Sequence, residues 1–200
     1  MLRLMAIAVL AVAGLSGCAT GYLLDNTVQS FSGLAASPAT PTYRLDRLPS
    51  QQASPVQTQV EAWADPALFK AGLRRDDAAP RYGVQVTARV QRVLSPWADP
   101  WDTWGGWGGW GRVGHFHRGV GIGFGLGGPL HRMDQPWFQR EVEVLVRELA
   151  SNRVVYETRA GNDGPWRDDA SVFPAMFEAA LQGFPTPPPG PRRVNVQIGK

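Results

Sequence analysis

Residues 82–91 read Tyr-Gly-Val-Gln-Val-Thr-Ala-Arg-Val-Gln, and this stretch decides the fold class. Apolar or aromatic side chains occupy every second position, and Gln, Thr and Arg fill most of the positions between them. Because successive side chains of a strand point to opposite faces, one face of this strand is apolar and the other is polar. We therefore predict a strand over residues 81–93, in an antiparallel sheet that has one buried and one solvated face.

The same alternation recurs further along the chain. Residues 138–149 alternate valines with charged side chains, Ser151-Asn152 is typical of a turn, and residues 154–160 return as a second strand. This order predicts a β-hairpin. Shorter β-prone stretches, which we also expect to be strands, cover residues 27–31, 42–48 and 194–198.

Two segments have apolar residues at helical spacing. The first covers residues 57–73 and ends at Gly72; Asp65-Pro66 within it indicates either one kinked helix or two short ones. The second covers residues 172–181, with Ser171 as the expected N-cap and Pro174 in the expected first turn. Together the elements predict an α+β domain: an antiparallel sheet of about four to six strands with two helices packed on one face, plus a long Gly/Trp-rich loop.

The N-terminus has the pattern of a bacterial lipoprotein signal peptide. Arg3 supplies a positive charge, residues 4–15 are an apolar run too short to span a membrane, and Leu15-Ser16-Gly17-Cys18 follows. Lipoprotein signal peptidase requires small residues before a cysteine whose thiol carries diacylglycerol. We expect cleavage between Gly17 and Cys18, with lipidation of Cys18. Two or more acyl chains hold a protein stably on a membrane.

Cys18 is also the one cysteine of the chain, so an intramolecular disulfide and a cysteine-based metal site are excluded. Ala19 stands where an aspartate would favour retention in the inner membrane. We therefore expect an outer-membrane lipid anchor facing the periplasm. The predicted organisation is a signal peptide over 1–17, a lipidated tether over 18–26, and one periplasmic domain over 27–200, with a Gly/Trp-rich insert at 97–137 and a Pro-rich segment at 185–192.

The charge pattern argues against a nucleic-acid partner. The formal net charge is +3, and the Lys and Arg residues are scattered along the chain. Nucleic-acid binders concentrate basic residues on one face or in runs. The expected partners are the membrane, through the lipid on Cys18, and an envelope protein.

The order of these elements resembles a known family of bacterial lipoproteins, the domain-of-unknown-function family 4136. The likeness runs from Val28 to Pro185. The shared features are the lipobox Leu15-Ser16-Gly17-Cys18, the segment Thr42-Tyr43-Arg44 and the helix that ends at Gly72. They also include Tyr82-Gly83-Val84-Gln85-Val86, Arg153-Val154-Val155-Tyr156, and the helix that leads into Phe184-Pro185. The long glycine insert and the strand after Pro191 depart from the family's pattern. The resemblance implies a cell-envelope lipoprotein fold and brings no catalytic residues.

The Gly/Trp-rich insert contains the candidate contact residues, which are aromatic or imidazole side chains set among glycines: Trp101, Trp104, Trp107, Trp110, His115 and His117. Aromatic side chains on a loop can stack on sugars, bind a partner or lie at a lipid interface. The competing interpretation is a low-complexity loop that tolerates insertion outside the core. Gly and apolar residues alternate over 119–127, which is compatible with a strand as well as a loop.

A metal site and an enzyme active site have less support. All three histidines, His115, His117 and His131, lie in the insert, but no neighbouring residues would orient their rings. We therefore expect no metal and no cofactor. No His-Glu-x-x-His, Gly-x-Ser-x-Gly or phosphate loop is present, and Asp76-Asp77 and Asp168-Asp169 are typical of helix starts and turns. The sequence thus favours a non-catalytic structural or interaction module; the alternative is a lipoprotein that binds a small ligand or a metal through the Trp/His-rich loop.

Overall fold

The computed structural model describes residues 21–96, 136–165 and 168–199. These residues divide into two compact units, the first formed by residues 21–88, 141–162 and 168–199 and the second by 89–96, 136–140 and 163–165. The elements are β1 (Tyr22–Ser32), β2 (Thr42–Leu45), the 3-10 helix η1 (Pro49–Gln51), α2 (Pro55–Lys70), β3 (Arg74–Arg75), β4 (Tyr82–Val93), β5 (Trp137–Glu148), β6 (Arg153–Gly164), α4 (Asp169–Leu181) and β7 (Arg192–Ile198).

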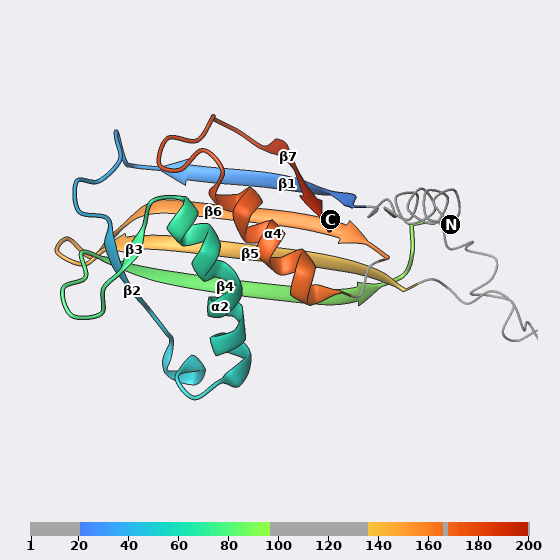
Figure 1. The fold of residues 1–200 in the computed structure, drawn as a ribbon, viewed down its shortest axis with the longest axis horizontal. Coiled ribbons are helices and arrows are strands. Elements are labelled where there is room, and N and C mark those ends of the chain that lie inside the picture. The colour runs from blue at the N-terminus through green and yellow to red at the C-terminus, as the bar shows by residue number, and fades with distance from the viewer. Residues whose placement is uncertain (1–20, 97–135, 166–167, 200) are drawn as a thin grey trace, which may run out of the picture. The chain divides into compact units, whose positions relative to one another are not determined.

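The strands form one seven-stranded sheet in the order β3-β2-β4-β5-β6-β1-β7. In the first unit, α2 and α4 lie on one face of this sheet (Figure 1). The core between them is built from the alternating strand residues and the helix stripes that the sequence predicts. Its members include Val84, Val86, Val142, Val144, Val146, Leu68, Met176 and Phe177, each almost fully buried. The fold class is therefore α+β.

The expectation of a purely antiparallel sheet is wrong, because β2 pairs parallel with both β3 and β4. The physical reason is α2, which connects β2 to the strands that follow it. A helical crossover returns the chain in the same direction, whereas a tight turn reverses it. The number of strands, seven, also exceeds the four to six expected, because the two-residue β3 has no alternation that would reveal it. The Gly/Trp-rich loop lies outside the described residues.

Both helices begin earlier than predicted. Ser54 caps α2 and accepts a hydrogen bond from the backbone N–H of Gln57, and Pro66 lies inside this single helix. Gly72, with a φ of 96°, follows the helix in the left-handed region that glycine adopts without strain. The cap of α4 is Asp168, not Ser171, because the Asp168 carboxylate accepts from the Ser171 backbone N–H.

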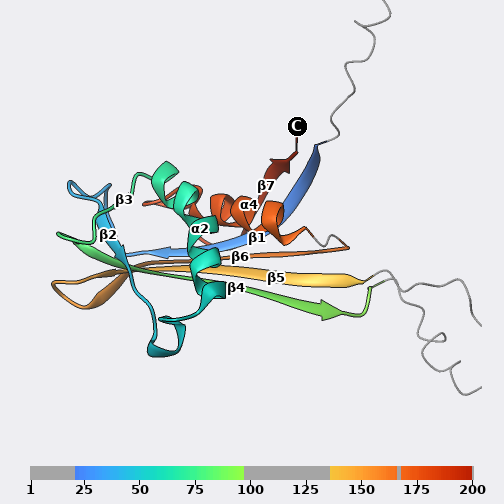
Figure 2. The ribbon, with the colours of Figure 1, turned by 60° about the horizontal axis from the view of Figure 1, so that its bottom comes forward.

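The first strand also starts within the expected tether. Residues 22–26 belong to β1 and pair antiparallel with residues 194–198 of β7. Asn26, the last residue of the expected tether, is buried and donates from its side chain to the carbonyl oxygens of Leu24 and Val194. Viewed from the side, the start of β1 and all of β7 rise from the sheet toward the helices (Figure 2).

The described part of the second unit contains ends of β4, β5 and β6. Within it, the Trp137 indole N–H donates to the Asp163 carboxylate at 2.9 Å. The Arg140 guanidinium lies 5.2 Å from the centre of the Phe138 ring, a cation–π distance. In the part of the chain that the structure describes, no helix is long and apolar enough to cross a membrane.

Candidate functional site

The site residues predicted from the sequence lie outside the described residues. This holds for the cleavage pair Gly17 and Cys18 and for all six aromatic and histidine candidates of the insert: Trp101, Trp104, Trp107, Trp110, His115 and His117. Within the described ranges, no group of three or more His, Cys, Asp or Glu side chains is arranged to hold a metal ion. The hollowed surface of the first unit lies elsewhere, over α4.

Two neighbouring hollows lie between α2, α4 and β7. The larger, of about 500 Å³, is lined by the ends of both helices and the middle of β7, and the smaller, of about 370 Å³, by the beginning of α4 and the end of β7. They share Ala67, Lys70, Glu178, Val196 and Gln197. Together they form a trough, which we call the α4 trough, with α4 as its floor and α2 and β7 as its walls. Each volume is in the range of ligand-binding pockets.

Small side chains make the floor of the smaller hollow. Ala170, Ser171, Pro174 and Ala175 line it, and larger apolar residues of α4, such as Phe173 and Phe177, are buried beneath. Because α4 places its bulky residues toward the sheet, only short side chains remain on the opposite strip of the helix. The floor therefore leaves room for a layer of polypeptide above it.

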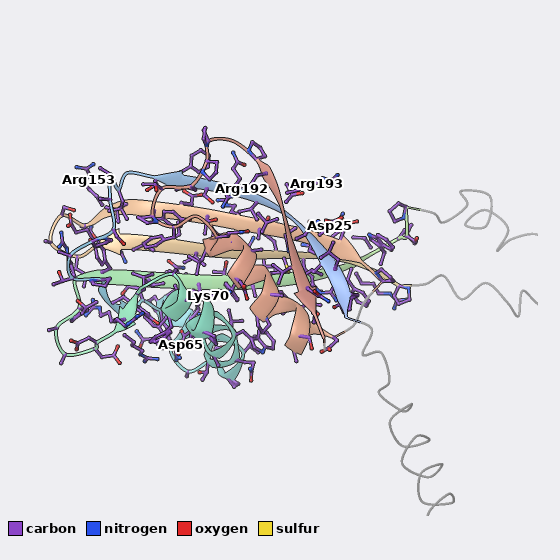
Figure 3. The ribbon with its side chains drawn as sticks, turned by 45° about the horizontal axis from the view of Figure 1, so that its top comes forward. Asp25, Asp65, Lys70, Arg153, Arg192 and Arg193 are labelled. Carbon is purple, nitrogen blue, oxygen red and sulfur yellow. The ribbon has the colours of Figure 1, made fainter. Side chains whose placement is uncertain are left out.

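A salt bridge joins the two helices across the trough. Lys70, at the end of α2 (labelled in Figure 3), contacts the Glu178 carboxylate on α4. Both side chains are largely solvent-exposed, so the pair contributes little to stability. Its position among the residues shared by both hollows makes it the polar boundary between them.

Buried contacts hold the trough in place. At its smaller end, the Trp63 ring on α2 stacks on Phe173 of α4 with ring centres 5.2 Å apart. Beneath the other end of α4, the Thr158 hydroxyl on β6 donates to the carbonyl of Ala180 at 2.8 Å and lies 2.7 Å from the Ser30 hydroxyl on β1. These contacts fix α4 against both α2 and the sheet, so the trough is a preformed feature of the fold.

The shifted pKa values have structural causes and belong to groups that do not line the trough. Burial, reinforced by a 2.9 Å hydrogen bond to Asp65, raises the pKa of the Tyr43 phenol, and burial raises the pKa of Tyr156. Hydrogen bonds from Ser171 lower the pKa of the Asp168 carboxyl. The trough has neither His nor Cys in its lining. The lining consists of one ion pair, the three amide side chains of Gln182, Asn195 and Gln197, and side chains that are otherwise mostly small or apolar.

Sequence reasoning missed this trough. The helices that form its floor and one wall, α4 and α2, are both expected from the sequence. The other wall is β7, whose position depends on its pairing with residues of the expected tether. One usable signal was present: the apolar stripe of residues 173–184 leaves Ala170, Ser171 and Pro174 on the other side of the helix.

Comparison with known proteins gives a family and a set of distant structural likenesses. The family model DUF4136, a domain of unknown function, matches residues 28–186. No curated protein matches the chain. Two solved structures of PelC from Paraburkholderia phytofirmans, each described as a dodecamer, are similar to it at 13% and 12% identity, with TM-scores of 0.46 and 0.47; each match covers 82% of this chain and 99% of PelC.

A PDZ domain protein from Parabacteroides distasonis is similar at 14% identity with a TM-score of 0.49, and the match covers 94% of this chain and 42% of that protein. With identities this low and all three TM-scores below 0.5, these likenesses carry no information about function or assembly.

Proposed function

Because the chain belongs to the DUF4136 family, whose function is unknown, we propose its role from its own residues: a lipid-anchored cell-envelope lipoprotein that acts as a non-catalytic interaction module at the outer membrane. The observation that carries the proposal is Leu15-Ser16-Gly17-Cys18 at the end of a twelve-residue apolar run, residues 4–15. Diacylglycerol on Cys18, with a further acyl group, would hold the chain on a bilayer, since one acyl chain alone binds only marginally.

The α4 trough supports the interaction half of the proposal. It is preformed and is lined by one exposed ion pair and by amide and apolar side chains. The trough is suited to holding a partner.

The anchoring claim is tested by changing the thiol alone. Cys18→Ser should abolish labelling with radioactive palmitate and leave the precursor uncleaved, because the peptidase acts after the thiol is modified. The matched control is Ser16→Ala, which keeps a small residue before the cleavage position and should be labelled and processed normally. If Cys18→Ser still fractionates with processed wild-type protein, the lipid anchor is refuted.

The choice of membrane is tested at the next residue. Ala19→Asp should move the labelled protein from outer-membrane to inner-membrane fractions in a sucrose gradient, without affecting palmitate labelling. A wild-type protein that sediments with the inner membrane would overturn the outer-membrane assignment and leave the anchor intact.

The aromatic insert offers a second role, the binding of a small ligand or a metal, because the candidate tryptophans and all three histidines are gathered within residues 101–131. Deletion of residues 101–128 separates the two roles. An unchanged partner set and metal content in the deletion variant would rule out the insert as the functional surface. Loss of the partner set would place the function there.

A further inference from the structure

β7 forms one edge of the sheet. Among the strands that the structure describes, it pairs with β1 alone, through seven consecutive residue pairs from Tyr22↔Ile198 to Val28↔Arg192. The opposite edge of the sheet is β3, which is two residues long and consists of Arg74 and Arg75. Short, charged edges resist pairing with further strands, whereas a long edge is a template for them. The two edges therefore differ in kind: β3 is protected, and β7, seven residues long and without proline, is open to pairing.

The register shows which residues of β7 direct their backbone to the open side. The Gly33 N–H donates to the Val155 carbonyl at 2.8 Å, so odd-numbered residues of β1 bond to β6. In an antiparallel ladder, successive residues direct their backbone N–H and C=O groups to opposite sides of the strand. The even-numbered residues of β1 therefore bond to β7. Their partners on β7 are also even-numbered, as in Leu24↔Val196.

The odd-numbered residues of β7, Arg193, Asn195 and Gln197, consequently direct both their N–H and C=O groups away from β1. The side chain of Asn162 supports this alternation, because it donates at 2.7 Å to the carbonyl of Asp25, an odd-numbered residue of β1 that faces β6.

The α4 trough lies beside this open edge. Asn195, Val196 and Gln197 line the larger hollow, and Val196, Gln197 and Ile198 line the smaller. Because β7 rises toward the helix layer (Figure 2), a strand added to its free edge would extend over α4. The small floor residues Ala170, Ser171, Pro174 and Ala175 would lie below such a strand.

The positive charge of Arg193 favours extended segments that carry an acidic side chain. Arg193 is exposed at the beginning of β7 and takes part in no ion pair among the described residues. An acidic side chain directly opposite Arg193 on an added strand would be a favourable cross-strand pair, and a basic one would be unfavourable. The side chains that face the floor must be small or moderately apolar.

We propose that the free edge of β7 and the α4 trough bind an extended peptide segment of a partner protein by strand addition, with small side chains over α4 and an acidic side chain opposite Arg193. Strand addition supplies main-chain hydrogen bonds for affinity and uses alternate side chains for specificity. The inference rests on the proposed role as an interaction module and names the chemistry of its partner.

The test uses the full-length protein in detergent and two fluorescent seven-residue probes, Glu-Ala-Val-Ala-Val-Ala-Val and the reverse order. Their acidic residues would lie opposite Arg193 in the parallel and antiparallel orientations, respectively. One of them should bind in fluorescence anisotropy with a dissociation constant below about 1 mM, the weak end of specific recognition. Replacing Glu by Lys in that probe should weaken binding, and Arg193→Glu should reverse the preference.

A backbone readout makes the test specific to the edge. In amide hydrogen exchange of the free protein, Val194 and Val196 should be protected and Asn195 and Gln197 should exchange rapidly. Saturation with the probe should slow the exchange of Asn195 and Gln197 by about tenfold or more. Binding without this protection would overturn the proposal, as would the absence of binding by both probes.

A proline variant isolates the edge N–H group. Asn195→Pro removes one donor on the free side, where an edge strand tolerates proline, and should weaken probe binding by about tenfold. Asn195→Ala keeps the N–H group and is the matched control. Equal affinities of the two variants would refute strand addition. If Asn195→Pro does not fold, the exchange experiment on the wild-type protein still decides.

The same measurements on Cys18→Ser separate this inference from the anchor. Strand addition needs no lipid, so the variant should bind the probe as the wild-type protein does even though palmitate labelling is lost. Normal labelling with no probe binding would overturn the peptide site and leave the anchoring proposal standing.

Discussion

Arg192 Nη2 donates a hydrogen bond of 2.5 Å to the backbone carbonyl of Gln182, so that the first residue of β7 closes the C-terminal end of α4. Its Nη1 donates at 3.3 Å to the Ser30 hydroxyl on β1. The last carbonyls of a helix have no partner within the helix, and this end of the helix dipole attracts a cation. One guanidinium thus joins the floor of the α4 trough, its β7 wall and the sheet.

Replacement of this guanidinium should loosen the trough. We expect Arg192→Met to lower the free energy of unfolding by about 1–2 kcal/mol, because the hydrogen bonds to Gln182 and Ser30 are lost while the apolar stem is kept. Urea unfolding followed by circular dichroism measures the change. Arg193→Met is the matched control at the adjacent exposed position and should alter stability by less than about 0.5 kcal/mol. Equal effects of the two variants would show that the bonds of Arg192 contribute nothing.

The Thr158 hydroxyl should matter more than its neighbour on β1. Thr158→Val leaves the Ala180 carbonyl and the Ser30 hydroxyl without this partner in a buried place, and we expect a loss of about 1–3 kcal/mol. Ser30→Ala should cost less, because Thr158 keeps its bond to Ala180 and the volume lost is small. The two losses should not add in the double variant, which urea unfolding of all four proteins can show. An additive result would mean that the hydroxyls act independently.

Local sequence patterns reveal the burial of individual strand and helix faces. Alternation placed Val84 and Val86 on the buried face of β4, and helical spacing placed Phe173, Met176 and Phe177 in the core. Each of these predictions depends on neighbours within a few residues.

The features that the sequence did not reveal depend on distant partners. Asn26 is part of a strand because its side chain bonds to Val194, which lies 168 residues away. The parallel pairing of β2 depends on how α2 crosses the sheet, and the trough depends on the ladder between β1 and β7. No local pattern encodes these partners, so the expected antiparallel sheet and the expected tether differ from the structure at these points.

A close approach between Gly83 and Asp46 yields a double-mutant test. A Cβ atom at position 83 would lie 2.6 Å from Asp46 Oδ2 and 3.3 Å from the Leu149 side chain. Asp46 is held by Arg147, so Gly83→Ala must displace the carboxylate from this partner. Because a side-chain tip can move, we expect a modest loss of about 1–2 kcal/mol in the free energy of unfolding.

The contact with Asp46 is isolated by repeating the substitution in an Asp46→Ser background, where the shorter side chain leaves room for the new methyl group. There Gly83→Ala should cost less than about 0.5 kcal/mol, and the interaction energy of the cycle measures the clash. A cost that is the same in both backgrounds would assign the effect to the backbone or to Leu149.

The Tyr43 phenol should make the fold sensitive to alkaline pH. Burial, then the hydrogen bond to Asp65, raises its pKa above the ordinary value of 10.0. A group whose pKa is higher in the folded state keeps its proton there, so its contribution to stability is complete below pH 10 and is lost as the pH rises through the folded-state value.

We expect Tyr43→Phe to be less stable than wild type at pH 7 by about 1 kcal/mol, since a hydrogen bond is lost. Above pH 10 this deficit should shrink and then reverse, because phenylalanine does not titrate. Tyr156, whose pKa burial also raises, leaves some alkaline sensitivity in the variant. Urea midpoints measured from neutral pH to beyond pH 10 for both proteins test this, and a constant difference across that range would contradict the role of Tyr43.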